Sequence, residues 1–77
     1  QVKTDSSQGP LFWLRLMRLR HALSEACTGV PLAEVAAGAG FADQAHFTRE
    51  AVAFHGATPA RLLRDKAALE GILAPGL

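Results

Sequence analysis

Apolar residues recur along most of this chain at spacings of three and four, the period of an α-helix that buries one face. The first stripe predicts a helix over residues 10–27, with Pro10 in its first turn. Three further stretches have the same period: Leu32 to Gly38, about Gln44 to His55, and Pro59 to about Glu70. Alternating β-branched runs, which would predict strands, are missing. The pattern therefore predicts an all-α fold, a small bundle of three to four helices.

Glycine and proline mark the expected helix ends. Gly29 follows the first helix, and Gly38 and Gly40 are expected to bracket the next turn. Gly56 is expected to end the third helix, Thr58-Pro59 to cap the fourth, and Gly71 to end it. We expect residues 1–9 to form a disordered lead and residues 71–77 a frayed tail.

The second and third helices and the turn between them have the layout of a helix-turn-helix of the homeodomain-like kind, in which the second helix enters the DNA major groove. Asp43 stands where an N-cap belongs, with a carboxylate that can accept from free backbone N–H groups of the next turn. The turn after Gly40 is short enough to place the two helices against each other.

A wheel calculation at roughly 100° per residue separates two faces of the helix over 44–55. The buried stripe consists of Phe47, Ala51 and Phe54, and a separate outward arc holds Gln44, Ala45, Thr48, Arg49 and Val52. Gln pairs with adenine and Arg with guanine through two hydrogen bonds each, so this arc suits the reading of base edges. The alternative is the polar side of an ordinary surface helix.

The predicted core consists of apolar residues from the helices after the first and, at Phe41, from the turn of the helix-turn-helix: Leu32, Val35, Phe41, Phe47, Phe54 and Leu62. In the first helix the stripe is Phe12, Leu16, Leu19, Leu23 and Ala26, but further apolar residues, Leu11, Trp13, Leu14 and Met17, lie off it. A helix that is apolar on more than one side is normally covered by more than one neighbour. We therefore expect another domain or a second copy to pack here; the alternative is incidental exposure.

Composition adds few constraints. The 77 residues, 49% of them hydrophobic, fit one small globular domain. A net charge of +1 is low for a nucleic-acid binder, although basic residues cluster at Arg15, Arg18 and Arg20, and again at Arg61, Arg64 and Lys66. The single cysteine, Cys27, excludes an intrachain disulfide and is expected to be a buried small hydrophobe. The sequence shows neither the apolar segment of a signal peptide nor an apolar run long enough to cross a bilayer, so we expect a cytoplasmic protein.

Little in the chain favours an enzyme, and no cofactor or metal is expected. His46 and His55 are nine residues apart, which points them to nearly opposite sides of one helix, and His21 lies on another. Cys27 has no evident base, and no glycine loop precedes a basic residue in the phosphate-binding pattern.

The run PLAEVAAGAGFADQAHFTRE, followed by GATPARLLR, resembles the carboxy-terminal half of the DNA-binding domain of AraC/XylS-type bacterial transcription regulators. The shared features are Ala36, Gly40-Phe41, Asp43-Gln44, Phe47 and Arg49, and the closing Gly56-x-Thr58-Pro59. RLRHAL at 18–23 resembles the end of the family's long linker helix. The resemblance covers roughly residues 9–65.

This resemblance implies a linker helix over 10–27 and a second helix-turn-helix subdomain over 28–70. It places base-reading positions on Gln44, Ala45, Thr48 and Arg49, with His46 on the flank near the phosphate backbone. The expected partner is double-stranded DNA, with RNA polymerase as a further candidate. It also implies that a first helix-turn-helix, and commonly an effector or dimerisation domain, lies upstream. Where many members have Lys or Arg just after Arg49, this chain has Ala51, Val52 and Ala53, which predicts weaker binding and shallower salt dependence.

A second function remains open from the residues alone. A near-neutral charge and an outward-facing Val52 would also suit a helix-turn-helix remnant that no longer reads DNA and instead packs on a protein partner.

Overall fold

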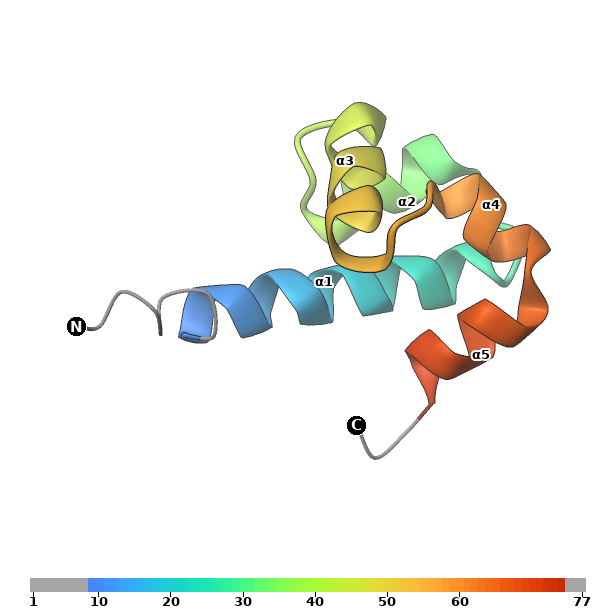
Figure 1. Cartoon of the computed structure of the whole chain (residues 1–77). Coiled ribbons are helices and arrows are strands. Elements are labelled where there is room, and N and C mark those ends of the chain that lie inside the picture. The colour runs from blue at the N-terminus through green and yellow to red at the C-terminus, as the bar shows by residue number, and fades with distance from the viewer. Residues whose placement is uncertain (1–8, 75–77) are drawn as a thin grey trace.

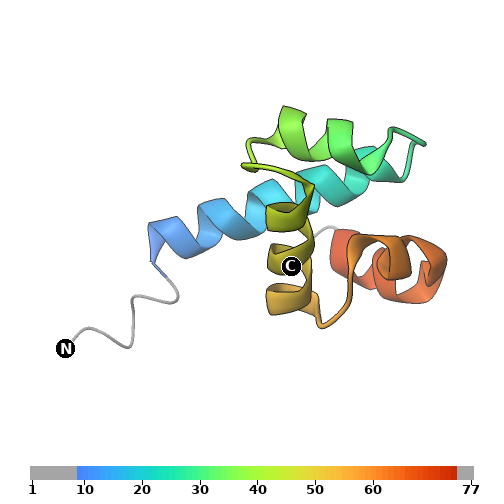
Figure 2. The same cartoon turned by 90° about the horizontal axis from the view of Figure 1, so that it is seen from above.

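Five α-helices build the fold in a computed structural model, which describes residues 9–74 (Figure 1). They are α1 (Pro10–Ala26), α2 (Leu32–Ala39), α3 (Gln44–His55), α4 (Pro59–Arg64) and α5 (Lys66–Leu73). No strand occurs within that range, so the predicted all-α class is confirmed. The helix α3 lies across α1, while the amino-terminal end of α1 projects beyond the other helices (Figure 2).

The first helix begins as predicted, with Pro10 in its first turn, and ends one residue earlier than predicted, at Ala26. Gly29 follows with a φ of 97°, the left-handed conformation that suits glycine. Cys27 lies at the C-cap and is exposed, so the prediction of a buried cysteine is wrong. The buried face of the last turn is formed by Leu23 and Ala26 instead.

The turn of the helix-turn-helix depends on Gly40, which has a φ of 94°. The N–H of Phe41 donates to the carbonyl of Ala36 at 3.0 Å, the backbone bond that closes a helix end of this glycine type. Gly38 does not bracket the turn as predicted, because it lies inside α2, which continues to Ala39.

The predicted final helix is broken in two at Asp65, whose φ and ψ are −107° and 89°. The Asp65 carboxylate accepts from the N–H of Ala68 at 3.1 Å and so caps a new helix, α5, which turns back toward α1 (Figure 1). Gly71 does not end this helix, and 71–73 of the predicted tail are helical. Ala74 follows as the C-cap of this helix, while residues 75–77 of the predicted tail and the predicted lead, apart from Gly9, lie outside the described residues.

The core forms where α1, α2 and α3 meet and is extended by the last two helices. Its buried apolar residues are Leu19, Ala22, Leu23, Ala26, Val35, Ala36, Phe41, Phe47, Ala51, Leu62 and Leu69. The rings of Phe41 and Phe47 stack with centroids 5.1 Å apart. Of the predicted core, Phe54 and Leu32 are only half-buried and pack against its edge.

An apolar patch remains exposed on the projecting end of α1. It consists of Leu11, Trp13, Leu14 and Met17, with exposed fractions of 69, 51, 65 and 44%. The predicted surplus of apolar surface on this helix is therefore present, and no other described part of the chain covers it.

Candidate nucleic-acid interface

The start of α3 is fixed by its cap. Asp43 has an extended backbone, and its Oδ1 accepts from the N–H of His46 at 2.8 Å, as the sequence predicted. At the other end, Gly56 adopts a φ of 77° and closes the helix. The same cap chemistry recurs at α4, where the Thr58 hydroxyl accepts from the N–H of Arg61. Local chemistry thus sets both ends of the candidate reading helix.

The outward face of α3 is open to solvent, as the wheel predicted. Gln44, Ala45 and Arg49 are exposed, and Thr48 is half-buried. Beneath them, Phe47 and Ala51 are fully buried and hold the helix on the bundle. The structure therefore brings the four predicted base-reading side chains onto one accessible surface.

His46 lies beside this surface and is tied to the preceding turn. Its Nδ1 accepts from the N–H of Ala42 at 3.1 Å, and its ring meets the Phe41 ring edge-on, with centroids 5.2 Å apart. Because Nδ1 accepts a hydrogen bond, the neutral ring carries its proton on Nε2, which can then donate to an anion.

One important residue of α3 was missed at the sequence level. Glu50 is 7% exposed, and its carboxylate receives two hydrogen bonds from Arg15 of α1: Nη2 to Oε2 at 2.6 Å and Nε to Oε1 at 3.3 Å. The Arg15 guanidinium holds the pKa of this carboxyl below its ordinary value, and Glu50 raises the pKa of Arg15. The available signal was a charged residue between Phe47 and Phe54, on the side of the helix that the wheel assigns to the core.

The other arginines of α1 also bind within the molecule. Arg18 donates to the carbonyl of Gly40 at 3.4 Å and lies over the Phe41 ring, 5.2 Å from its centroid. Arg20 donates to the carbonyl of Ala74 at 3.3 Å. Arg18 and Arg20 of the basic cluster therefore bind the turn after α2 and the residue after α5 to α1.

Apart from Arg49 on α3, the cations without such partners within residues 9–74 lie on the last two helices. Arg61, Arg64 and Lys66 are exposed. Arg61 and Arg64 line a cleft of about 570 Å³ together with His55, whose Nε2 is buried without a hydrogen-bond partner in the described chain. Burial lowers the pKa of His55, and Arg20 lowers it further, because both disfavour the charged imidazolium.

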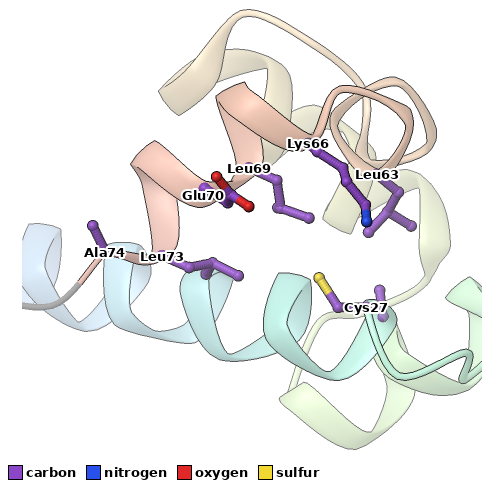
Figure 3. A pocket seen from close by; sticks show the side chains of 8 residues that line it. Cys27, Leu63, Lys66, Leu69, Glu70, Leu73 and Ala74 are labelled. Carbon is purple, nitrogen blue, oxygen red and sulfur yellow. The ribbon is translucent and has the colours of Figure 1, made fainter.

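A second, more apolar groove of about 560 Å³ lies between the end of α1 and α5 (Figure 3). Its walls are Ala26, Cys27, Leu63, Lys66, Leu69, Glu70, Leu73 and Ala74. None of the predicted base-reading residues lines it, so it is separate from the open face of α3.

Comparison with known families agrees with this geometry. A family model described as a helix-turn-helix domain matches residues 2–65. The chain therefore belongs to the helix-turn-helix proteins, and within them to the AraC-type DNA-binding family. No curated protein and no solved structure matches the chain.

Metal binding and membrane insertion also bear on the kind of site. The described residues contain no group of three or more His, Cys, Asp or Glu side chains that could hold a metal ion. Among the helices of residues 9–74, none has the length and apolar character needed to cross a membrane.

Proposed function

We propose that this chain is the sequence-specific DNA-binding part of an AraC-type transcription regulator, with α3 as its reading helix in the major groove. The observation that carries the proposal is the open face of α3, where Gln44 and Arg49 stand exposed over buried Phe47. Gln44 would pair with adenine and Arg49 with the O6 and N7 of guanine. Ala45 and Thr48 would contact neighbouring base edges, and His46 would donate from Nε2 to a phosphate on the flank.

The test is a comparison of base discrimination in Arg49→Ala and in the unaltered protein. A consensus duplex is first obtained by selection from random sequences, and each base pair is then exchanged in turn. We expect Arg49→Ala to lose about 1–3 kcal/mol of discrimination at one G·C pair and little elsewhere. Full retention of the preference at every base pair would contradict the proposal.

Arg64→Ala is the matched control, because it removes an exposed arginine from α4 rather than from the reading face. If Arg64 contacts DNA at all, it meets the phosphate backbone, so its loss should weaken specific and non-specific binding by the same factor. Discrimination between bases should then stay as it is in the unaltered protein.

The apolar patch of α1 supports a larger assembly around this domain. We propose that a first helix-turn-helix covers Trp13 and its neighbours in the intact regulator, and that an effector or dimerisation domain and RNA polymerase are further partners. A DNA partner would place the protein on the bacterial nucleoid. An intact reading frame that encodes no helix-turn-helix besides the one in this chain would contradict this arrangement.

A second candidate function is favoured by that exposed patch and by the net charge of +1. In it, the chain is a helix-turn-helix remnant that binds a protein and has lost DNA readout. Titration with labelled duplex at low salt separates the two functions. A reader should bind non-specific DNA with a Kd of roughly 10⁻⁴–10⁻⁶ M, and a remnant should show no binding.

A further inference from the structure

Val52 is an aliphatic side chain exposed on the candidate reading helix. It is 46% exposed, and the other large hydrophobic residues with comparable exposure in residues 9–74 all belong to the apolar patch of α1. Val52 is not among the residues of the buried core or those packed against it, to which the neighbouring Ala51 belongs.

The position of Val52 on α3 places it within the proposed reading face. At about 100° per residue, the four proposed base-reading residues span an arc of about 140° that starts at Gln44, and Val52 falls near its middle, at about 80°. Along the axis it lies about 4.5 Å beyond Arg49, at about 1.5 Å per residue. That distance is little more than the rise of about 3.4 Å between stacked base pairs.

In the major groove the base edges present hydrogen-bonding groups and one apolar group, the C5 methyl of thymine. An aliphatic side chain that enters the groove must either meet such a methyl or bury polar edges without partners, which is unfavourable. We propose that Val52 is a specificity-determining residue that selects a thymine, through contact with its methyl group, within about two base pairs of the guanine read by Arg49. This inference rests on the proposed function and adds to it an apolar step of recognition.

The test uses the full chain and replaces thymines by deoxyuridine, which removes the methyl group and leaves the hydrogen-bonding edge unchanged. In the duplex obtained by selection, each thymine is replaced singly and the affinity is measured. For the unaltered protein, we expect one thymine whose demethylation weakens binding by roughly fourfold, the contribution of one buried methyl-sized group. In Val52→Ala, the same replacement should change the affinity by less than about twofold.

Leu14→Ala is the matched control, because it truncates an exposed aliphatic side chain of α1 outside the reading face. It should leave the ratio of affinities for the thymine and deoxyuridine duplexes at the unaltered value. Far-ultraviolet circular dichroism should show that Val52→Ala remains helical, since Val52 belongs neither to the buried core nor to the residues packed against it and alanine favours a helix.

The outcomes separate this inference from the proposal on which it rests. A consensus sequence in which no thymine methyl matters, or in which Val52→Ala leaves the methyl effect intact, would overturn the inference and leave the reading of bases standing. Failure of the selection to enrich any sequence would overturn both.

Discussion

At the scale of single residues, two glycines in the helix-turn-helix have opposite conformational demands. Gly40 has a φ of 94°, and a Cβ placed on it would lie 3.7 Å from the Cδ of Arg18. Gly38 is helical, and a Cβ there would meet nothing within 4 Å. The first position needs glycine for its backbone, while the second does not.

Alanine at the two positions should therefore change stability in opposite directions. Gly40→Ala should lower the free energy of unfolding by about 1–2 kcal/mol, the penalty for a side chain in the left-handed region. Gly38→Ala should raise it by up to about 1 kcal/mol, because alanine loses less entropy in a helix. Urea unfolding followed by circular dichroism measures both. Equal effects of the same sign would show that the backbone of the turn is not set by Gly40.

The open face of α3 was predictable from sequence because exposure on a short helix follows directly from its period. Gln44 and Arg49 needed only the wheel to be placed outward, and Asp43 needed only the cap preference of its position. Glu50 was not predictable with the same rules, since its burial depends on Arg15, a partner 35 residues away in the sequence. Cys27 was misplaced because its burial was expected from residue type alone, whereas it lies at the C-cap of α1, beyond the buried stripe that ends at Ala26.

At the scale of elements, α3 is held on α1 by an ion pair, Arg15–Glu50, and by aromatic packing beside it. The Arg15–Glu50 pair lies next to Phe54, whose ring centroid is 5.4 Å from the Arg15 guanidinium carbon and 5.4 Å from the Phe12 ring centroid. Because Glu50 follows Arg49 directly, the same pair that anchors the helix also fixes the rotation at which Arg49 faces outward.

Removing the charge of Glu50 should weaken this attachment in a pH-dependent way. Glu50→Gln should lower the free energy of unfolding at pH 7 by about 1 kcal/mol, a modest value because the Arg15 side chain is 42% exposed. The pKa of Glu50 is lowered in the folded state, so its stabilising effect is complete above the ordinary value near 4.5 and is lost as pH falls through the folded-state pKa. The difference between variant and unaltered protein should therefore disappear in acid.

Glu70→Gln provides the comparison for this experiment, as an exposed carboxylate on α5 without an ion pair in residues 9–74. Its effect on unfolding at pH 7 should stay within about 0.5 kcal/mol. A Glu50→Gln difference that persists unchanged in acid would indicate lost packing rather than a lost ion pair.

Most helix ends could be predicted from local chemistry, and the break at Asp65 could not. Residues on both sides of Asp65 are good helix formers, and the apolar spacing continues across it. The break allows Leu69 to be buried within the core, a non-local contact that a local pattern does not contain. Asp65 is also a good N-cap, so the sequence permits the break without demanding it.

At the scale of the whole molecule, the distribution of charge differs from what the sequence suggested. The arginines of α1 are engaged within the bundle, which leaves Arg61, Arg64 and Lys66, besides Arg49 of α3, as the described cations without an intramolecular partner. The charge that steers this domain to DNA is therefore small.

Binding to non-specific duplex should accordingly depend only moderately on salt. With about three phosphates neutralised, a plot of log K against log salt concentration should have a slope no steeper than about −3. Fluorescence anisotropy at a series of KCl concentrations measures it. A slope near −6 would mean that the arginines of α1 leave their intramolecular partners when DNA binds.

The apolar end of α1 also gives the protein a built-in optical reporter. Trp13 is the single tryptophan of the chain, it is 51% exposed, and its ring meets Phe12 edge-on at a centroid distance of 5.5 Å. Since it belongs to the apolar patch of α1 and not to the open face of α3, duplex alone should leave its emission maximum unchanged. Any neighbouring domain that packs on α1 should shift the maximum to shorter wavelength. Assembly of the proposed regulator can thus be followed spectroscopically without an added label, and independently of its binding to DNA.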